Sequence, residues 1–269
     1  MAIEKYNKLV GNLRAFNKVA VSFSGGVDST LLLYAAKEAL GENVIAITAD
    51  SSVLPHSEFD EAKSLCESSG VRHITFEFNP LSVDEFRSNV KERCYYCKKS
   101  LMSVMREVAH ENGFDVLVEG SNIDDELDYR PGSKALQEMK IISPLNEAGL
   151  SKQEIRDLSK KYNLPTWDKP SYACLATRIP YGEEITLSKL NMVEKGEAIL
   201  HEHGFLQSRV RAHGSVARLE IMPCDFDKIL SEDVRSAVVQ GIKDSGFDYV
   251  SLDLEGFRTG SMNIGVTTE

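Results

Sequence analysis

The sequence predicts an α/β fold, in which a parallel β-sheet with helices on both faces is followed by a smaller C-terminal α+β domain. Two observations lead to this prediction. In the first part of the chain, short runs rich in β-branched and apolar residues alternate with longer runs whose apolar residues recur at helical spacing. After Pro180-Tyr181-Gly182 this alternation stops. We therefore expect one domain over residues 1–180 and a second over residues 181–269.

The first domain contains four predicted strands, each followed by a helical pattern. The strands are expected at residues 18–23, 44–49, 72–78 and 116–119, and the helices at residues 29–40, 57–69, 97–112 and 151–162. Such alternation is typical of a parallel sheet, whose ligands bind at the carboxyl ends of the strands. That edge would bring together Ser24–Ser29, Asp50–Ser51 and Gly120–Asp128.

The second domain has a different order of elements. Helices are expected at residues 187–203 and 231–245, and strands at residues 209–213, 217–222 and 249–254. Two neighbouring strands between helices indicate a small α+β unit rather than a continuation of the parallel sheet.

Bulk properties narrow the class of protein. The chain has 269 residues, of which 42% are apolar and 27% charged, as in proteins with a sizeable core. Its amino terminus lacks the basic and apolar regions of a signal peptide, and no run of about 18 apolar residues could cross a bilayer. We therefore expect a cytoplasmic protein with no membrane partner.

Charge and cysteine content argue against two further classes of protein, those that bind nucleic acid and those stabilised by disulfides. The net charge is −10, from 31 basic and 41 acidic residues, whereas proteins that grip a phosphate backbone usually carry a basic face. A nucleic-acid partner is therefore disfavoured. Five cysteines, an odd number in a cytosolic protein, argue against a disulfide framework.

A glycine turn after the first predicted strand indicates an anion site. Ser24-Gly25-Gly26-Val27-Asp28-Ser29 joins that strand to a helix, so backbone N–H groups and the helix dipole would face a phosphate. The common phosphate loop, G-x-x-x-x-G-K-[ST], has a lysine that this turn lacks. An acidic Asp28 in such a site implies a divalent cation, Mg²⁺. A plain glycine-rich turn is the alternative.

The SGGVDS spacing resembles the PP-loop family of ATP pyrophosphatases. The resemblance implies that ATP is cut between its α and β phosphates, with release of pyrophosphate and transfer of an adenylate to the substrate. Asp28 would be catalytic through its metal, and the hydroxyls of Ser24 and Ser29 would donate to phosphate oxygens. Further ATP contacts are expected from Gly25, Gly26, Asp50, Ser51, Gly120 and Asp125, with the ribose near Asp50 and Ser51.

Three cysteines have a pattern that can bind a metal centre. Cys94 and Cys97 form a C-x-x-C among basic residues, which lower thiol pKa values and favour thiolates. Cys174 is the candidate third ligand. Two unrelated cysteines or a redox dithiol are the alternatives. Cys66 and Cys224 look like small core residues.

Several segments together resemble the LarE family of ATP-dependent sulfur transferases. They are SFSGGVDSTLLL, RCYYCKK, DDELDYRPG, KPSYACLATRIPYG, RVRAHGSVARLE and LDLEGFRTGSMN, and they cover most of the chain. The family adenylates a carboxylate of pyridinium-3,5-biscarboxylic acid mononucleotide and replaces its oxygen with sulfur, in nickel-pincer nucleotide cofactor biosynthesis. The resemblance implies the same activity and substrate for this chain.

The family uses two sources of sulfur. Some members sacrifice the sulfur of the cysteine matching Cys174, which becomes dehydroalanine; others hold a 4Fe-4S cluster with three cysteines. Because Cys94, Cys97 and Cys174 are all present, this chain resembles the cluster type, and an extra sulfide on the unliganded iron would be delivered. Sulfide or a sulfur-donor protein would then be a partner. Sacrificial use of Cys174 and a structural zinc, with His73 or His110 as fourth ligand, remain the alternatives.

Arginines of the second domain are candidates for the substrate phosphate. Arg209 and Arg211 alternate in a predicted strand and share a face, and paired guanidiniums suit a phosphate. A charged face paired with Glu220 is the alternative reading, and the resemblance favours the phosphate. Arg178 is a weaker candidate, and Glu197 matches an acidic position of the family. This domain would also contribute contacts of a homo-oligomer.

Three rival functions follow from the same residues. A cluster-dependent tRNA thiolase also joins a PP-loop to three cysteines, although the negative charge weighs against it. An amide-forming PP-loop synthetase would use ammonia and leave the cysteines incidental. A regulator that binds ATP without cleaving it would release no pyrophosphate.

Overall fold

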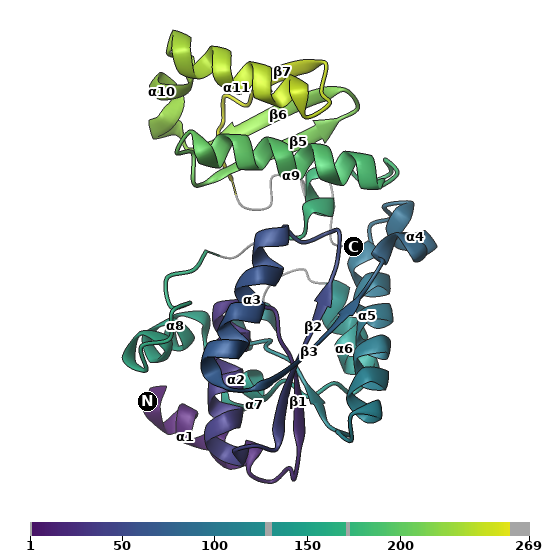
Figure 1. The fold of residues 1–269 in the computed structure, drawn as a ribbon, viewed down its shortest axis with the longest axis vertical. Helices are drawn as coiled ribbons and strands as arrows, with labels where there is room; N and C mark the ends of the chain where they lie inside the picture. The colour runs from purple at the N-terminus through teal and green to yellow at the C-terminus, as the bar shows by residue number, and fades with distance from the viewer. Residues whose placement is uncertain (1, 127–130, 171–172, 259–269) are drawn as a thin grey trace. The chain divides into compact units, whose positions relative to one another are not determined.

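The computed structural model describes residues 2–126, 131–170 and 173–258, which form two compact units (Figure 1). The first unit contains Met1–Val83 and Glu92–Tyr172, and the second contains Asp84–Lys91 and Ala173–Glu269. Within the described residues, every helix is too short or too polar to cross a bilayer.

The division between the units differs from the boundary expected at residue 180. Buried Asn89 explains the difference, because its side-chain amide donates to the carbonyls of Ile179, Pro180 and Glu183 at 3.3, 2.7 and 3.0 Å. These bonds tie a short segment from the middle of the first domain to the start of the second unit. Sequence periodicity gives no sign of such a contact.

The first unit is built on a four-stranded parallel sheet with the order β3-β2-β1-β4. Its strands are β1 (Val19–Ser22), β2 (Val44–Asp50), β3 (Arg72–Glu77) and β4 (Leu117–Val118). All four lie where the sequence predicts them. Ser22 at the end of β1 pairs with Ile47, so β2 continues to Asp50 beyond the last pair.

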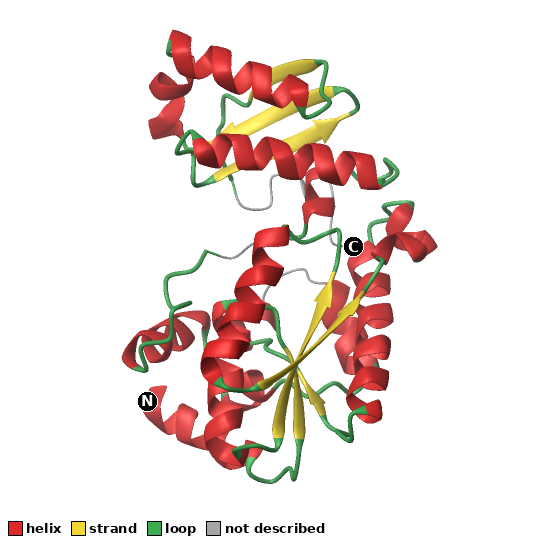
Figure 2. Ribbon diagram, viewed as in Figure 1, coloured by secondary structure: helices red, strands yellow, loops and turns green. Residues whose placement is uncertain are grey.

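Helices cover both faces of this sheet, which confirms the predicted fold class (Figures 1 and 2). One face carries α1 (Ala2–Leu13), α2 (Val27–Leu40), α3 (His56–Ser69), α7 (Pro144–Ala148) and α8 (Lys152–Lys161); the other carries α5 (Arg93–Glu111) and α6 (Pro131–Glu138). Alternate strand residues serve the two cores: Val19 and Val21 face the first, and Ala20 faces the second. The short turns η1 (Pro80–Ser82) and η2 (Ile123–Glu126) complete the unit.

The second unit is an α+β layer with a three-stranded sheet of order β5-β6-β7 (Figure 2). β5 (Ser208–His213) and β6 (Val216–Ile221) are antiparallel, and β7 (Tyr249–Leu252) pairs with β6 in parallel. The helices are α4 (Asp84–Arg87), α9 (Leu187–Glu202), α10 (Phe226–Leu230) and α11 (Glu232–Asp244), with short turns η3 (Leu175–Arg178) and η4 (Pro223–Asp225). The predicted strands and the two long helices are therefore present.

Helix α1, which the sequence analysis did not predict, packs on α2 through a buried tyrosine. The Tyr6 ring is 2% exposed and lies 4.8 Å from the ring of Tyr162. Its hydroxyl donates to the carboxylate of Glu38 at 2.6 Å. Burial and the Glu38 charge together raise the pKa of Tyr6. This contact helps to position α2, the helix that begins at the glycine turn.

We expect Tyr6→Phe to lower the free energy of unfolding by about 2 kcal/mol, because a hydrogen bond to a charged group is lost. Urea denaturation measures this loss. Tyr34→Phe is the matched control, since the hydroxyl of Tyr34 has no hydrogen-bond partner among the described residues. Equal stability of the two variants would show that the bond to Glu38 contributes nothing.

Candidate active site

The glycine turn forms the predicted strand–loop–helix cradle at the carboxyl end of β1. Gly25 has a φ of 69°, and a Cβ there would lie 3.1 Å from the Cβ of Ala62 in α3. Both conditions favour glycine. Gly26 is the N-cap of α2 and gives that helix no side-chain hydrogen bond. The first backbone N–H groups of α2 are therefore left to an anion.

Ser24 and Ser29 hold the loop in shape. Their Oγ atoms are 3.1 Å apart, and the Ser29 hydroxyl also donates to the carbonyl of Gly26 at 3.1 Å. The backbone N–H of Ser24 donates to the same hydroxyl at 3.3 Å. Both hydroxyls thus bond within the loop and fix its shape.

Asp28 lies in the first turn of α2 and has two partners from distant segments. Its Oδ2 forms an ion pair with the ammonium of Lys152, the first residue of α8. Its Oδ1 accepts a hydrogen bond from the Asn122 amide at 3.2 Å. Sequence reasoning missed Lys152, because 124 residues separate it from Asp28. No spacing rule links them.

The segment after β4 closes against the start of α2, as predicted for Gly120. A Cβ on Gly120 would lie 3.2 Å from the backbone nitrogen of Ser29, which is tight, so a larger residue would require a small shift of one of the two segments. Asp125 accepts from the backbone N–H of Asn122 at 3.0 Å and so closes a local turn. Its predicted ATP contact therefore competes with a role in shaping the loop. Asp128 lies outside the described residues.

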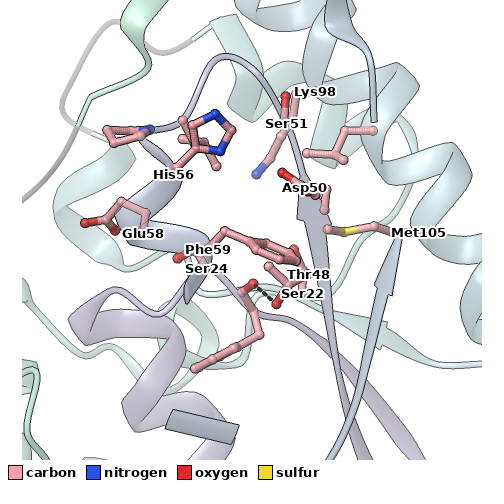
Figure 3. Close-up of a pocket in the computed structure, with 15 residues that line it drawn as sticks. Ser22, Ser24, Thr48, Asp50, Ser51, His56, Glu58, Phe59, Lys98 and Met105 are labelled. Carbon is pink, nitrogen blue, oxygen red and sulfur yellow. Dashed lines mark hydrogen bonds between the residues drawn. The ribbon is translucent and has the colours of Figure 1, made fainter. Parts of the chain in front are cut away.

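A cavity at the end of β2 brings Ser24 together with Asp50 and Ser51, as predicted (Figure 3). His56, Glu58 and Lys98 also line it and were not predicted. Its walls are mainly apolar with a few convergent polar groups, the usual character of a small-molecule site.

Lys169 ties the glycine turn to α3. Its ammonium is 3.0 Å from the carboxylate of Glu58 and 2.6 Å from that of Glu61, and it donates to the Gly25 carbonyl at 3.3 Å. Burial raises the pKa of Glu58, although the Lys169 ammonium opposes this shift. Lys169 thus braces the loop from the side facing α3.

Cys94 and Cys97 share the first turn of α5. This helix begins at Arg93 rather than at residue 97, so both thiols are half-buried at helical i,i+3 positions on one face. Lys98, the next residue, lines the cavity at the end of β2. The cysteine pair and this cavity thus share helix α5, although neither cysteine lines the cavity.

Cys174 belongs to the second unit and immediately precedes the turn η3. Its carbonyl accepts from the Thr177 backbone at 2.9 Å, the Thr177 hydroxyl at 2.7 Å and Arg178 Nη1 at 3.2 Å. Among the described residues, no group of three or more His, Cys, Asp or Glu side chains lies close enough to hold one metal ion.

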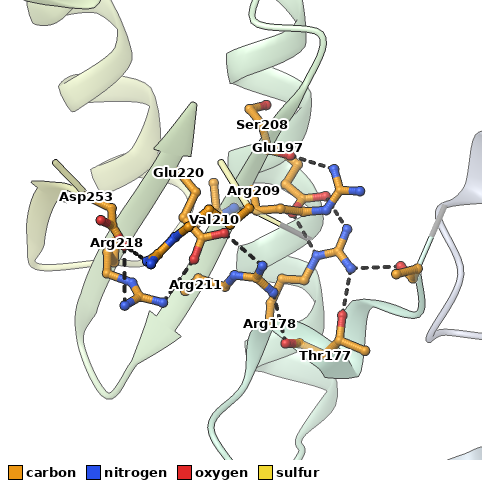
Figure 4. Close-up of polar contacts among 12 residues, drawn as sticks. Thr177, Arg178, Glu197, Ser208, Arg209, Val210, Arg211, Arg218, Glu220 and Asp253 are labelled. Atoms are coloured by element: carbon orange, nitrogen blue, oxygen red, sulfur yellow. Dashed lines mark hydrogen bonds and ion pairs between the residues drawn. The ribbon is translucent and has the colours of Figure 1, made fainter. Parts of the chain in front are cut away.

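Arg178, a predicted phosphate ligand, holds this turn through hydrogen bonds within the fold (Figure 4). It is 1% exposed. Its Nε and Nη2 donate to the Glu197 carboxylate at 2.8 and 3.0 Å, and its Nη1 donates to the Ala173 carbonyl at 2.8 Å. Because these donors are committed inside the fold, Arg178 has little capacity left for a substrate.

Arg209 and Arg211 lie on β5, but their surroundings differ. Arg211 is 5% exposed and donates to Glu220 at 2.8 Å and to the Thr177 carbonyl at 3.1 Å. Arg209 forms no ion pair with a carboxylate among the described residues; it donates to the Ser208 carbonyl at 2.6 Å and lies over the Phe257 ring. Burial, then repulsion from Arg178, lower the pKa of Arg209. Arg209 is thus the better placed of the pair to meet an anion.

The remaining two cysteines, Cys66 and Cys224, were both expected in the core, and this is correct only for Cys66. Cys66 is fully buried in α3, and burial raises its pKa to about 12. Cys224 was expected in the core but is exposed in the turn η4. Strand β6 ends at Ile221, and Pro223 begins the turn η4. Cys224 therefore lies after the strand, in an exposed turn rather than in the core.

Comparisons with known proteins agree with this architecture. A family model described as a PP-loop domain matches residues 1–130. The protein slr1717 of Synechocystis sp. is 39% identical over 94% of this chain and 96% of its own length. Pyridinium-3,5-bisthiocarboxylic acid mononucleotide synthase of Lactiplantibacillus plantarum is 37% identical over 96% of this chain and 94% of its own length. The protein MJ0830 of Methanocaldococcus jannaschii is 29% identical over 96% of this chain and 98% of its own length.

The synthase from Lactiplantibacillus plantarum is similar over nearly the whole chain, including the second unit, and its name describes a bisthiocarboxylate product. The PP-loop domain accounts for the ATP-binding part of the first unit. Together these matches show that the chain is an enzyme and that it belongs to the LarE family of PP-loop, ATP-dependent sulfurtransferases.

Proposed function

We propose that this enzyme adenylates a carboxylate of pyridinium-3,5-biscarboxylic acid mononucleotide and replaces the activated oxygen with sulfur, in nickel-pincer nucleotide cofactor biosynthesis. The observation that carries the proposal is the 37% identity to the bisthiocarboxylate synthase, which extends over 96% of this chain. The coordinates add a preorganised anion cradle beside a small-molecule cavity. Both features are what an adenylating enzyme needs.

ATP would occupy the first unit in two parts. The cavity at the end of β2 would take the adenosine, with Asp50 and Ser51 beside the ribose. The backbone N–H groups at the start of α2 would hold the phosphates. Asp28, a partly exposed carboxylate at the cradle, fits Mg²⁺, which is usually bound by one or two carboxylates plus phosphate oxygens. Bound Mg²⁺ would stabilise charge on the departing pyrophosphate.

Adenylation solves a leaving-group problem. A carboxylate oxygen attacks the α-phosphorus, the bond to the β-phosphate oxygen breaks, and its electron pair leaves with pyrophosphate. The original oxygen then departs as part of AMP when sulfur attacks the acyl carbon. In this scheme the cradle of α2 holds the phosphates in place, and Arg209 holds the substrate phosphate from β5 with Arg211 at its side.

The sulfur would come from a 4Fe-4S cluster held by Cys94, Cys97 and Cys174. The i,i+3 pair at the N-terminus of α5 fits such a cluster, because both half-buried cysteines lie on one face of the helix. Arg178 and Glu197 would fix the turn that presents Cys174. When bound, the cluster would supply the sulfide, recharged by free sulfide or a sulfur-donor protein. The second unit would also form the contacts of a homo-oligomer.

The adenylation step is tested by pyrophosphate exchange. We expect labelled pyrophosphate to enter ATP only when the biscarboxylate mononucleotide is present. Asp28→Asn should slow this exchange by about 10²-fold or more, because the carboxylate that fits Mg²⁺ is lost. Asp157→Asn, in an exposed part of α8, is the matched control. Exchange without the carboxylate, or full exchange by Asp28→Asn, would contradict the proposal.

The cluster is tested by purification without oxygen. We expect a coloured protein with about four irons per chain and repeated turnover when sulfide is added. Cys94→Ala, Cys97→Ala and Cys174→Ala should each lose the colour, whereas Cys224→Ala, at an exposed position outside the site, should keep it. Iron-free protein that transfers one sulfur and converts Cys174 to dehydroalanine would replace the cluster with sacrificial chemistry. Zinc in place of iron would indicate a structural site.

A further inference from the structure

Arg209 on β5 is a half-buried arginine with no carboxylate of its own to balance its charge among the described residues. Its Nη1 donates to the Ser208 carbonyl at 2.6 Å. Burial, and then repulsion from Arg178, disfavour the charged form and lower its pKa. A guanidinium in such surroundings needs some other favourable contact to stay charged and in place.

The ring of Phe257 provides that contact. Arg209 Cζ lies over this ring, 5.2 Å from its centroid, and Phe257 is itself half-buried. An aromatic face attracts a guanidinium through the ring quadrupole, more strongly where water is excluded. This attraction acts on the charge and uses none of the five N–H donors of the arginine. Arg211, by contrast, donates to the Glu220 carboxylate at 2.8 Å.

The chain after β7 is shaped to bring Phe257 to this place. The Phe257 backbone N–H donates at 2.8 Å to the carbonyl of Ile221, the last residue of β6. Ile221 pairs on its other side with Ser208, the residue before Arg209. Gly256 has a φ of 72°, and a Cβ there would lie 2.8 Å from the same carbonyl oxygen. Both conditions favour glycine, so backbone contacts fix the start of the Phe257 side chain.

The carboxylates of this turn belong to other arginines. Asp253 lies 3.5 Å from Arg218 and 3.7 Å from Arg258. Glu255 lies 2.5 Å from Arg258. Arg218 and Arg258 are thus held by carboxylates, whereas Arg209 is held by a ring.

We propose that Phe257 is a positioning residue for the substrate phosphate. Its ring holds the Arg209 guanidinium on β5 as a cation and leaves N–H donors for phosphate oxygens. A carboxylate in place of the ring would also hold the arginine, but it would accept the same donors and repel the phosphate. Phe257 thereby sets the preference of the enzyme for the mononucleotide over the nucleoside without a phosphate. This inference rests on the proposed function, which assigns the substrate phosphate to Arg209.

The preference is tested by calorimetry in the absence of ATP, with pyridinium-3,5-biscarboxylic acid mononucleotide and with its dephosphorylated nucleoside. We expect Phe257→Leu to weaken binding of the mononucleotide about tenfold, which is about 1.4 kcal/mol, and to leave binding of the nucleoside unchanged. Phe257→Tyr, whose ring also attracts cations, should bind the mononucleotide nearly as well as the wild type. Tyr249→Leu, which removes an exposed aromatic residue of the same unit, is the control and should bind both ligands unchanged.

A double-mutant cycle separates this role from a general effect on the fold. In an Arg209→Ala background, Phe257→Leu should cause no further loss of affinity for the mononucleotide, because the ring acts through the guanidinium. Thermal unfolding checks that each variant is folded, and Phe257→Met gives the same comparison if the leucine variant is not. Equal weakening of both ligands, or an undiminished effect without Arg209, would show that Phe257 has only a structural role.

The wild-type enzyme distinguishes failure of this inference from failure of the proposed function. Wild-type protein that binds the mononucleotide no more tightly than the nucleoside would contradict the proposed phosphate site, and the role of Phe257 with it. A wild-type preference for the mononucleotide that persists in full in Phe257→Leu would contradict the role of Phe257 alone.

Discussion

The close approach of Gly120 to the backbone of Ser29 is the constraint on which the phosphate site depends. A Cβ on Gly120 would lie 3.2 Å from the Ser29 nitrogen, so any larger residue would require the end of β4 or the first turn of α2 to shift by a few tenths of an ångström. This approach brings Asn122 to Asp28, and the backbone bond from Ile123 to the Leu150 carbonyl brings the start of α8 alongside. Three segments of the chain therefore meet around a single carboxylate, and Lys152 reaches Asp28 from a distant helix.

The second unit gathers positive charge around β5, although the protein as a whole is acidic. Glu220 is fully buried and accepts from both Arg211 and Arg218, at 2.8 and 3.0 Å. Buried ion pairs seldom add much stability, because desolvation offsets the attraction. In this unit the ion pairs hold the guanidiniums of Arg211 and Arg218 in fixed positions on β5 and β6. Arg209 has no carboxylate ion pair in the described part of the chain, and its guanidinium lies over the Phe257 ring. The negative surface elsewhere does not prevent this local arrangement.

Local patterns predicted most of the fold and part of the site. Apolar periodicity located every strand, and the glycine turn located the cradle, because both depend on residues close in sequence. Contacts between distant segments could not be predicted in this way. The pairing of Lys152 with Asp28, the bracing by Lys169 and the clamp of Arg178 on the Cys174 turn all depend on tertiary packing. The ion pair of Arg178 with Glu197 could not be predicted for the same reason: an arginine paired with a buried glutamate looks the same in sequence as one that binds phosphate.

The central claim is that ATP activates the very oxygen that sulfur then replaces. The most direct measurement starts from substrate whose carboxylates are labelled with oxygen-18 and follows the label by mass spectrometry. An acyl-adenylate pathway predicts that each AMP gains one labelled oxygen for each sulfur inserted, because the carboxylate oxygen leaves on the phosphate. Unlabelled AMP formed together with thiocarboxylate would contradict the account, since the carboxylate would then have been activated without an adenylate.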